Sequence, residues 1–137
     1  MTGGQVSHEP LLRLNPDGMA PPAGLYSQGV LAPLNAQWLH ISGQIGVDAG
    51  GNLAADFDGQ AVAAWKNLFA VLRAAGMDAS HLVKVTTFLT DASHLPRVGP
   101  IRSRFLQNAR PASTLLIVPA LARPEWQVEI EAVACRP

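Results

Sequence analysis

Cysteine is almost absent from this sequence, since its 137 residues include a single one, Cys135. One cysteine cannot form a disulfide within the chain, and this usage is typical of a reducing compartment. The four histidines are scattered and show no spacing that would pair metal ligands on a helix or a hairpin; they are His8, His40, His81 and His94. We therefore expect no metal site, and we expect Cys135 to be a small packed side chain.

Charge is also scarce, at 15% of residues with a net charge of zero, and no run of lysine or arginine occurs. A nucleic-acid-binding surface needs clustered basic residues, so a nucleic-acid partner is disfavoured. No apolar stretch approaches the length of a membrane span, and residues 1–9 lack the apolar core of a secretory signal. The sequence predicts a cytoplasmic protein without a membrane partner.

Apolar residues are abundant instead, at 48% of the chain. The length suits one domain, which we place at residues 11–137 after a flexible N-terminus at residues 1–10. This much apolar surface indicates a sizeable core, with part of it buried against other subunits.

The hydrophobic periodicity predicts an α+β fold. Strands are expected at residues 11–14, 25–31, 38–42, 82–89, 113–118 and 127–134. A first helix is expected from about Asp58, its N-cap, to Ala75, with Gly76 as the C′ residue. A weaker helix, capped by residues 90–93 and ending near Gln107, should be distorted at Gly99-Pro100. We expect both helices on one face of the sheet and other subunits on the bare face.

The last strand carries two carboxylates on one face. Glu129, Glu131 and Val133 alternate with an apolar set comprising Val128, Ile130 and Ala132. The two carboxylates lie roughly 6–7 Å apart along a strand. Partial burial of this face would raise the pKa of at least one glutamate, whereas the simpler interpretation is a solvated polar face.

Six motifs in order resemble the RidA/YjgF family of reactive intermediate deaminases, also called the L-PSP or translation-inhibitor family. They are Gly24-Leu-Tyr-Ser-Gln28, Ile41-Ser-Gly-Gln44, Gln60 with Asn67 and Ala75-Gly76, Val83-Lys-Val-Thr-Thr-Phe88, Pro111-Ala112, and Val128-Glu-Ile-Glu-Ala132. The resemblance covers residues 11–134. It implies a chorismate-mutase-like fold in a homotrimer with a central β-barrel and small-molecule clefts between subunits.

The resemblance also implies a chemistry, the hydrolysis of enamines and imines to a keto acid and ammonia without metal or organic cofactor. By position, Glu129 matches the glutamate that activates water, Tyr26 a tyrosine that lines the cleft, and Ser42 a serine near the ligand. A carboxylate in a desolvated cleft suits proton exchange with water and an imine nitrogen.

Two positions depart from the family pattern. Ser113 stands where the deaminases carry an arginine that grips the substrate carboxylate, and Gly99 stands where they carry an asparagine. A hydroxyl cannot make that charged, two-pronged contact. A shifted alignment would give Arg110 the arginine's role, but it would put Pro111 inside the strand.

We therefore expect a hydrolase acting on C–N bonds of enamine or imine intermediates, with an altered substrate range and with Ser113 in the ligand site. The alternative is a non-catalytic ligand-binding or sensing trimer of the same fold. The ribonuclease activity of some relatives is disfavoured by the neutral charge.

Overall fold

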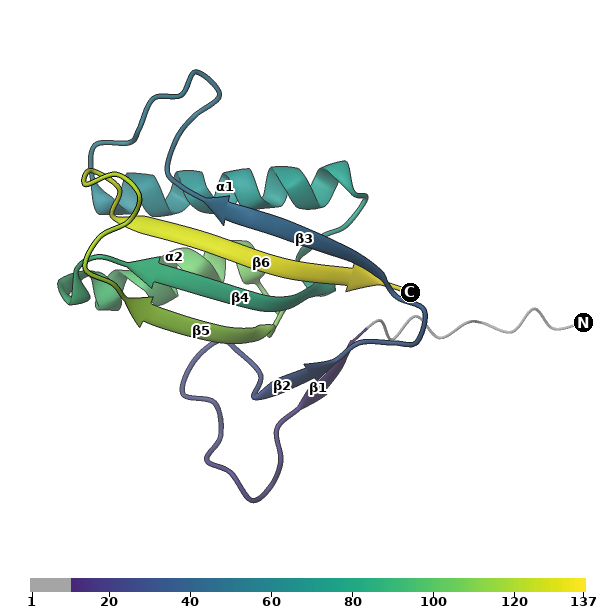
Figure 1. The fold of residues 1–137 in the computed structure, drawn as a ribbon. Coiled ribbons are helices and arrows are strands. Elements are labelled where there is room, and N and C mark those ends of the chain that lie inside the picture. Colours follow the sequence, from purple (N-terminus) through teal and green to yellow (C-terminus); the bar gives the residue numbers. More distant parts are fainter. Residues whose placement is uncertain (1–10) are drawn as a thin grey trace, which may run out of the picture.

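The computed structural model describes residues 11–137 (Figure 1). The expected flexible N-terminus, residues 1–10, lies outside the described residues. Six strands and two α-helices follow one another, with a short 3₁₀ turn before β4 and another before α2. Their bounds are β1 Leu12–Leu14, β2 Gly29–Leu31, β3 Gln37–Gln44, α1 Phe57–Ala74, η1 Ala79–His81, β4 Leu82–Leu89, η2 Ala92–His94, α2 Leu95–Leu106, β5 Ala112–Ile117 and β6 Val128–Arg136.

The main sheet has the strand order β3-β6-β4-β5, so the C-terminal strand lies in its interior. β6 runs antiparallel to both neighbours, and β5 runs parallel to β4. β1 and β2 form a separate antiparallel ribbon beside the β5 edge (Figure 1). β3 and β5 are therefore the two edges of the main sheet.

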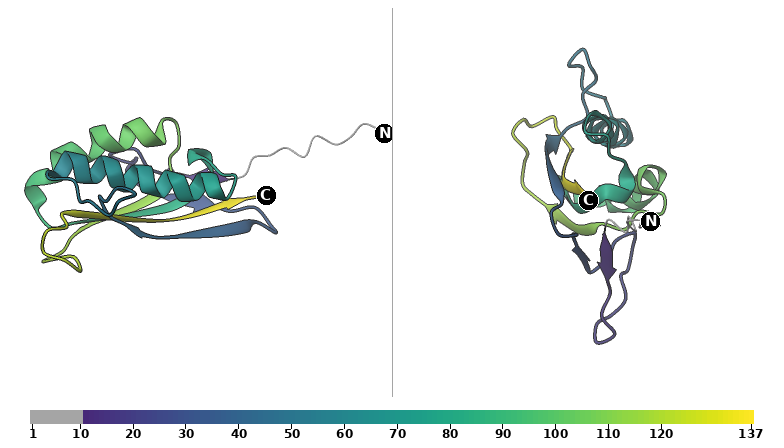
Figure 2. Two further views of the ribbon diagram at one scale, coloured as in Figure 1. Left: turned by 90° about the horizontal axis from the view of Figure 1, so that it is seen from above. Right: turned by 90° about the vertical axis from the view of Figure 1, so that its right-hand side faces the viewer.

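Both helices cover the same face of this sheet, as the view from above in Figure 2 shows. Trp65, Leu68 and Leu72 of α1 are buried against the apolar side of β6, which consists of Val128, Ile130, Ala132 and Ala134. Burial of large apolar side chains between two layers is the main stabilising term of such a domain. The predicted α+β class and the predicted face of β6 are confirmed.

Within residues 11–137, the opposite face of the sheet carries no helix (Figure 2). Large apolar side chains stay accessible on the two edge strands, with Trp38 of β3 49% exposed and Leu116 of β5 42% exposed. The expectation that other subunits cover this face stays a prediction. None of the helices within residues 11–137 is both long and apolar enough to cross a membrane.

Helix α1 begins at Phe57, and its N-cap is Asp56 rather than the predicted Asp58. Asp56 has extended backbone angles, and its carboxylate accepts a hydrogen bond of 2.8 Å from the Gly59 N–H. Asp58 lies inside the first turn, where it pairs with Arg97. The prediction of Gly76 as the C′ residue is confirmed, since its φ is +70°.

Helix α2 differs from the prediction at its start. Asp91 caps a 3₁₀ turn by accepting from the Ser93 N–H, and the α-helix itself begins at Leu95 with Pro96 in its first turn. The helix then continues through Gly99 and Pro100 to Leu106.

The strand predicted at residues 25–31 shrinks to Gly29–Leu31. Residues 25–28 leave the β1–β2 ribbon because Ser27 bonds elsewhere: its N–H donates to the Pro111 carbonyl at 3.1 Å, and its hydroxyl donates to the Arg110 carbonyl at 2.6 Å. Tyr26 is consequently held on a loop beside the start of β5.

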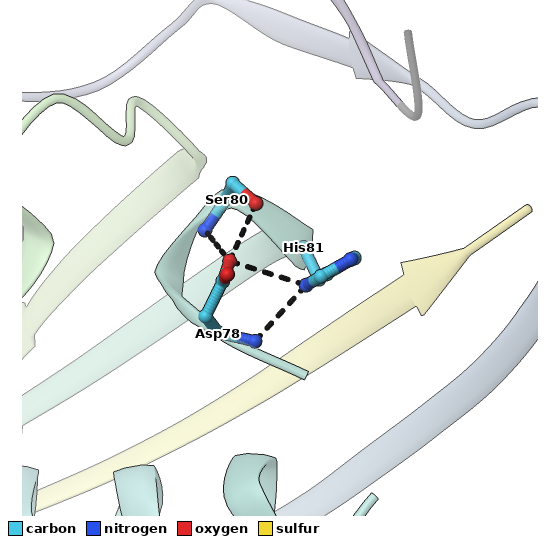
Figure 3. A network of polar contacts seen from close by, with 3 residues as sticks. All are labelled: Asp78, Ser80 and His81. Carbon is cyan, nitrogen blue, oxygen red and sulfur yellow. Dashed lines mark hydrogen bonds and ion pairs between the residues drawn. The ribbon is translucent and has the colours of Figure 1, made fainter. Parts of the chain in front are cut away.

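A polar network fixes the turn that leads into β4 (Figure 3). The Asp78 carboxylate accepts from the backbone and the hydroxyl of Ser80, while the His81 ring accepts from the Asp78 N–H. The Ser80 hydroxyl is the main cause that holds the pKa of Asp78 below its ordinary value of 3.8.

We predict that Asp78→Ala destabilises the protein at neutral pH by about 1 kcal/mol, a cap-sized loss reduced by the exposure of the carboxylate. Because the pKa of Asp78 is lowered on folding, its contribution is complete above 3.8 and is lost as the pH falls through the folded-state pKa. Urea unfolding at a series of pH values should therefore show the variant converging with the wild type in acid. A constant gap down to the lowest pH would contradict this, and Asp17→Ala at an exposed site is the control.

Candidate functional site

Glu129 lies near the start of β6, on the face away from the helices. Its Cα partner on β4 is Phe88, and its sequence neighbours Val128 and Ile130 are both buried in the core. Glu129 is half-buried, whereas Glu131 two residues later is exposed. The predicted alternation is confirmed, and the two carboxylates have different surroundings.

The Glu129 side chain packs directly on Gly43 of β3. A Cβ at Gly43 would lie 2.5 Å from Glu129 Oε1 and 2.8 Å from its Cδ, so only glycine leaves room for the carboxylate in this position. The register of β3 against β6 shifts between Ile41 and Gln44, which makes Gly43 part of a β-bulge-like irregularity.

Ser42 precedes Gly43 and is exposed on the same uncovered face. It borders a shallow hollow whose other polar lining residues are His40, Lys84, Thr86 and Glu131. The structure thus brings Ser42 and Glu129 to neighbouring positions on β3 and β6. We refer to Ser42, Gly43 and Glu129 as the glutamate group.

A buried glutamine holds this group in place from behind. Gln60 of α1 is 1% exposed; its amide nitrogen donates to the Ala54 and Glu125 carbonyls, and its amide oxygen accepts from the Gln127 N–H. These bonds anchor the loop before β6 two residues from Glu129. Helix α1 thereby positions the start of the strand.

Asn67, one of the motif residues on α1, anchors the loop after β3 in the same way. Its amide donates to the carbonyls of Ile45 and Val47 at 3.1 and 2.8 Å. Gln60 and Asn67 are therefore positioning residues behind the glutamate group.

Tyr26 and Ser113 form a second group, at the β5 edge. Ser27 makes a parallel bridge with Ala112, which sets Tyr26 beside the first residues of β5. The Tyr26 hydroxyl accepts from the Ala23 N–H at 3.2 Å. Ser113 pairs with Val85, a core residue 1% exposed, so its side chain points to the helix-covered side.

The residue that contacts Ser113 is Arg102 of α2, which the sequence analysis did not single out. Arg102 Nη1 donates to Ser113 Oγ at 3.3 Å, and Nη2 lies 3.7 Å from the place of a Cβ on Gly24. Burial, and secondarily the charge of Arg110, lower the pKa of Arg102 from its ordinary value. We refer to Tyr26, Arg102 and Ser113 as the arginine group.

Arg110 does not occupy the place that a shifted alignment would give it. Pro111 precedes β5, whose first residue is Ala112. The Arg110 guanidinium folds back and donates to the carbonyls of Gln107 and Ala109, both at 2.7 Å.

One chain does not bring the two groups together. Strand β5 is one edge of the sheet, and β6 lies beside the opposite edge strand, β3 (Figure 1). Ser113 on β5 faces the helices, whereas Glu129 on β6 faces away from them. Strand β4 therefore lies between the strands of the two groups, whose side chains are on opposite faces of the sheet, and each group is accessible from its own edge.

No cluster of three or more histidine, cysteine, aspartate or glutamate side chains suited to a metal occurs within residues 11–137. Cys135 is fully buried, and burial raises the pKa of its thiol. The thiol is therefore packed and unreactive.

Known proteins match almost the whole chain. The family model described as Endoribonuclease L-PSP matches residues 18–136. The protein DfrA of Myxococcus xanthus is 40% identical over 113 residues, which span 81% of this chain and 85% of DfrA. The 2-iminobutanoate/2-iminopropanoate deaminase of Rattus norvegicus is 37% identical over 113 residues, or 81% of this chain and 80% of the enzyme.

Solved structures agree with this assignment. The Rid family protein YyfB of Yersinia pestis superposes with a TM-score of 0.84 at 32% identity, covering 92% of this chain and 98% of YyfB. TdcF of E. coli with bound serine superposes with a TM-score of 0.69 at 27% identity, covering 92% of this chain and 99% of TdcF. The predicted YjgF-type α+β fold is confirmed, and the chain belongs to the Endoribonuclease L-PSP family, which is the RidA/YjgF family that its motifs resemble.

Proposed function

We propose that this protein hydrolyses enamine or imine intermediates to a carbonyl compound and ammonia, without a cofactor, in clefts between the subunits of a homotrimer. The observation that carries the proposal is the Glu129 carboxylate packed on Gly43, where any larger residue would displace the carboxylate. The relatives named 2-iminobutanoate/2-iminopropanoate deaminases support the reaction type.

The proposed chemistry needs one group that moves protons in both directions. Water adds to the imine carbon as Glu129 takes a proton from it, and Glu129 returns that proton to the imine nitrogen to give the tetrahedral carbinolamine. Glu129 then moves the hydroxyl proton of the carbinolamine to the amine nitrogen, so that the C–N bond breaks, ammonia leaves and a carbonyl group remains. An enamine first becomes the imine by gaining a proton on carbon and losing one from nitrogen. A half-buried carboxylate suits these steps, since positioned acid–base groups contribute about 10²–10⁴-fold.

The separation of the two groups supports a cleft shared between subunits. If the β3 edge of one protomer lies beside the β5 edge of the next, the glutamate group of one faces the arginine group of the other. A head-to-tail contact that repeats with a closing rotation produces a ring. The helix-free face, with exposed Trp38 and Leu116 at its edges, would then line the central barrel.

Ser113 supports a substrate range different from that of the family's deaminases. The strand position from which an arginine would grip the substrate now offers only a neutral hydroxyl. Any carboxylate on the substrate must then be held by another group, at a different place in the cleft.

The alternative function is a ligand-binding trimer without catalysis. The observation that favours it is Gly99, where a Cβ would meet no atom within 4 Å, so the helix offers no gripping side chain at that position. In that case a ligand would stabilise the fold while no ammonia is released.

We predict that Glu129→Gln lowers kcat for 2-iminobutanoate hydrolysis about 10²–10⁴-fold, because the amide cannot accept the proton from water. Glu131→Gln is the matched control, since this exposed carboxylate lies on the same face of the same strand, and it should keep wild-type kcat. Ammonia release measures both. Equal rates for the wild type and Glu129→Gln would reject Glu129 as the catalytic group, and a wild type that releases no ammonia would favour the binding trimer.

We predict that Gly43→Ala lowers kcat at least tenfold while the protein stays folded. The new Cβ overlaps only the end of a flexible side chain, so Glu129 rotates away and the backbone need not move. Circular dichroism and ammonia release separate the two effects. Gly18→Ala, where a new Cβ would meet no atom within 4 Å, is the control, and full activity in Gly43→Ala would contradict the proposed position of Glu129.

We predict that two inactive variants restore activity when their subunits are mixed. Unfolding and refolding Tyr26→Ala with Glu129→Gln should produce clefts that take an intact Tyr26 from one subunit and an intact Glu129 from the next. Random assembly makes about a quarter of clefts intact in a head-to-tail ring. A double variant refolded with itself is the control, and a mixture no more active than its components would place both groups in one subunit.

A further inference from the structure

We infer that Arg102 of helix α2 is the residue that binds the carboxylate of the substrate, in place of the arginine that this chain lacks on β5. The inference rests on the proposed function, and it assigns to Ser113 the role of orienting the Arg102 guanidinium. The positive charge that would bind the carboxylate is thus supplied by helix α2 instead of strand β5.

The location of Arg102 supports this assignment. Its Nη1 donates to Ser113 Oγ at 3.3 Å, so the charge lies directly beside the position where the family arginine is missing. Its Nη2 lies next to Gly24, on the loop that carries Tyr26. Three separate segments, α2, β5 and the loop before β2, therefore meet at one guanidinium.

The guanidinium has no anionic partner in the part of the chain that the structure describes. The ion pairs within residues 11–137 are Asp78 with His81 and Asp58 with Arg97, and neither includes Arg102. Arg102 Nε is buried without an acceptor there, and after burial the charge of another cation, Arg110, is what lowers the pKa of Arg102.

This arrangement is electrostatically unfavourable until an anion arrives. A partly buried cation loses hydration, and a neighbouring like charge adds repulsion. A bound carboxylate would reverse both terms, and arginine, which stays charged at physiological pH, offers five N–H donors for it. Within residues 11–137, only one of these five donors, an Nη1 hydrogen, makes a hydrogen bond, and its acceptor is Ser113 Oγ.

The glycines around Arg102 leave space for a ligand. Gly99 precedes Arg102 by three residues, which places both on the same side of α2, and a Cβ at Gly99 would meet no atom within 4 Å. The family pattern has an asparagine at the position of Gly99, whereas this chain has no side chain there and has a cation at Arg102. The polar group that faces the ligand is therefore about one helical turn further along α2 than in that pattern. The site therefore suits a small 2-imino or 2-oxo carboxylate held further toward the helix.

Binding of 2-oxobutanoate, the hydrolysis product of 2-iminobutanoate, tests the inference without turnover. Isothermal titration should show a Kd raised about 10- to 100-fold in Arg102→Gln, as expected for the loss of a charged hydrogen bond. Arg104→Gln, an exposed arginine of the same helix, should stay within about twofold of the wild type. Wild-type protein that does not bind 2-oxobutanoate, or Arg102→Gln that binds it equally well, would overturn the inference.

A substrate pair separates carboxylate binding from a structural role. For 2-iminobutanoate, Arg102→Gln should raise KM with little change in kcat, whereas the KM for its methyl ester should stay unchanged. Equal losses on both substrates would show a structural role and overturn the inference. Adding Ser113→Arg to Arg102→Gln should restore the KM for the acid, because it returns the charge to the strand.

The two proposals can fail separately. If the wild type releases no ammonia from either substrate but binds 2-oxobutanoate through Arg102, the proposed hydrolysis is wrong and the carboxylate site stands. If hydrolysis depends on Glu129 but neither binding nor KM depends on Arg102, the hydrolase stands and this inference is overturned.

Discussion

The register of β6 between β3 and β4 is the constraint on which the rest of this structure depends. It turns Val128, Ile130 and Ala132 into the helix-covered core and leaves Glu129 on the other face, so one alternation supplies both stability and a candidate acid. A slip by one residue would exchange the two faces and bury the carboxylates among apolar side chains. Gln60, which bonds to Glu125 and Gln127 in the loop before β6, and Gly43, which lies against the Glu129 carboxylate, both depend on this register.

The second organising feature is the distribution of polar groups between two sheet edges. The Glu129 carboxylate lies near the β3 edge and the Arg102 guanidinium lies near the β5 edge, so the two groups of one chain do not form an ion pair with each other. Both remain half-buried, and half-buried charged groups are costly unless a ligand or a second copy completes their surroundings. The uncovered sheet face between the edges has the same need for a partner. Subunit assembly and ligand binding would therefore cover the same exposed sheet face and the same unpaired charged groups.

Elements with a clear hydrophobic period were predictable from the sequence. The choice between neighbouring cap residues and the contacts between distant segments were not. β4 was predicted with its observed bounds, because a run of β-branched residues between turn signals permits few other structures. The N-cap was predicted at Asp58 instead of Asp56, since both aspartates precede the same apolar stripe and only the backbone angles distinguish them. Tyr26 lies on a loop because Ser27 bonds to residues more than eighty positions away, a contact without any local signal. Arg102 was missed because a helix arginine normally faces solvent; its spacing of three residues from Gly99 was the one available hint.

A crystal structure of the assembled protein with 2-oxobutanoate tests the central claim most directly. The account predicts a trimer in which the ligand carboxylate contacts Arg102 of one protomer while its keto carbon faces Glu129 of the next. A ligand held entirely by one chain would contradict the shared cleft. A carboxylate bound away from Arg102 would contradict the relocated cation.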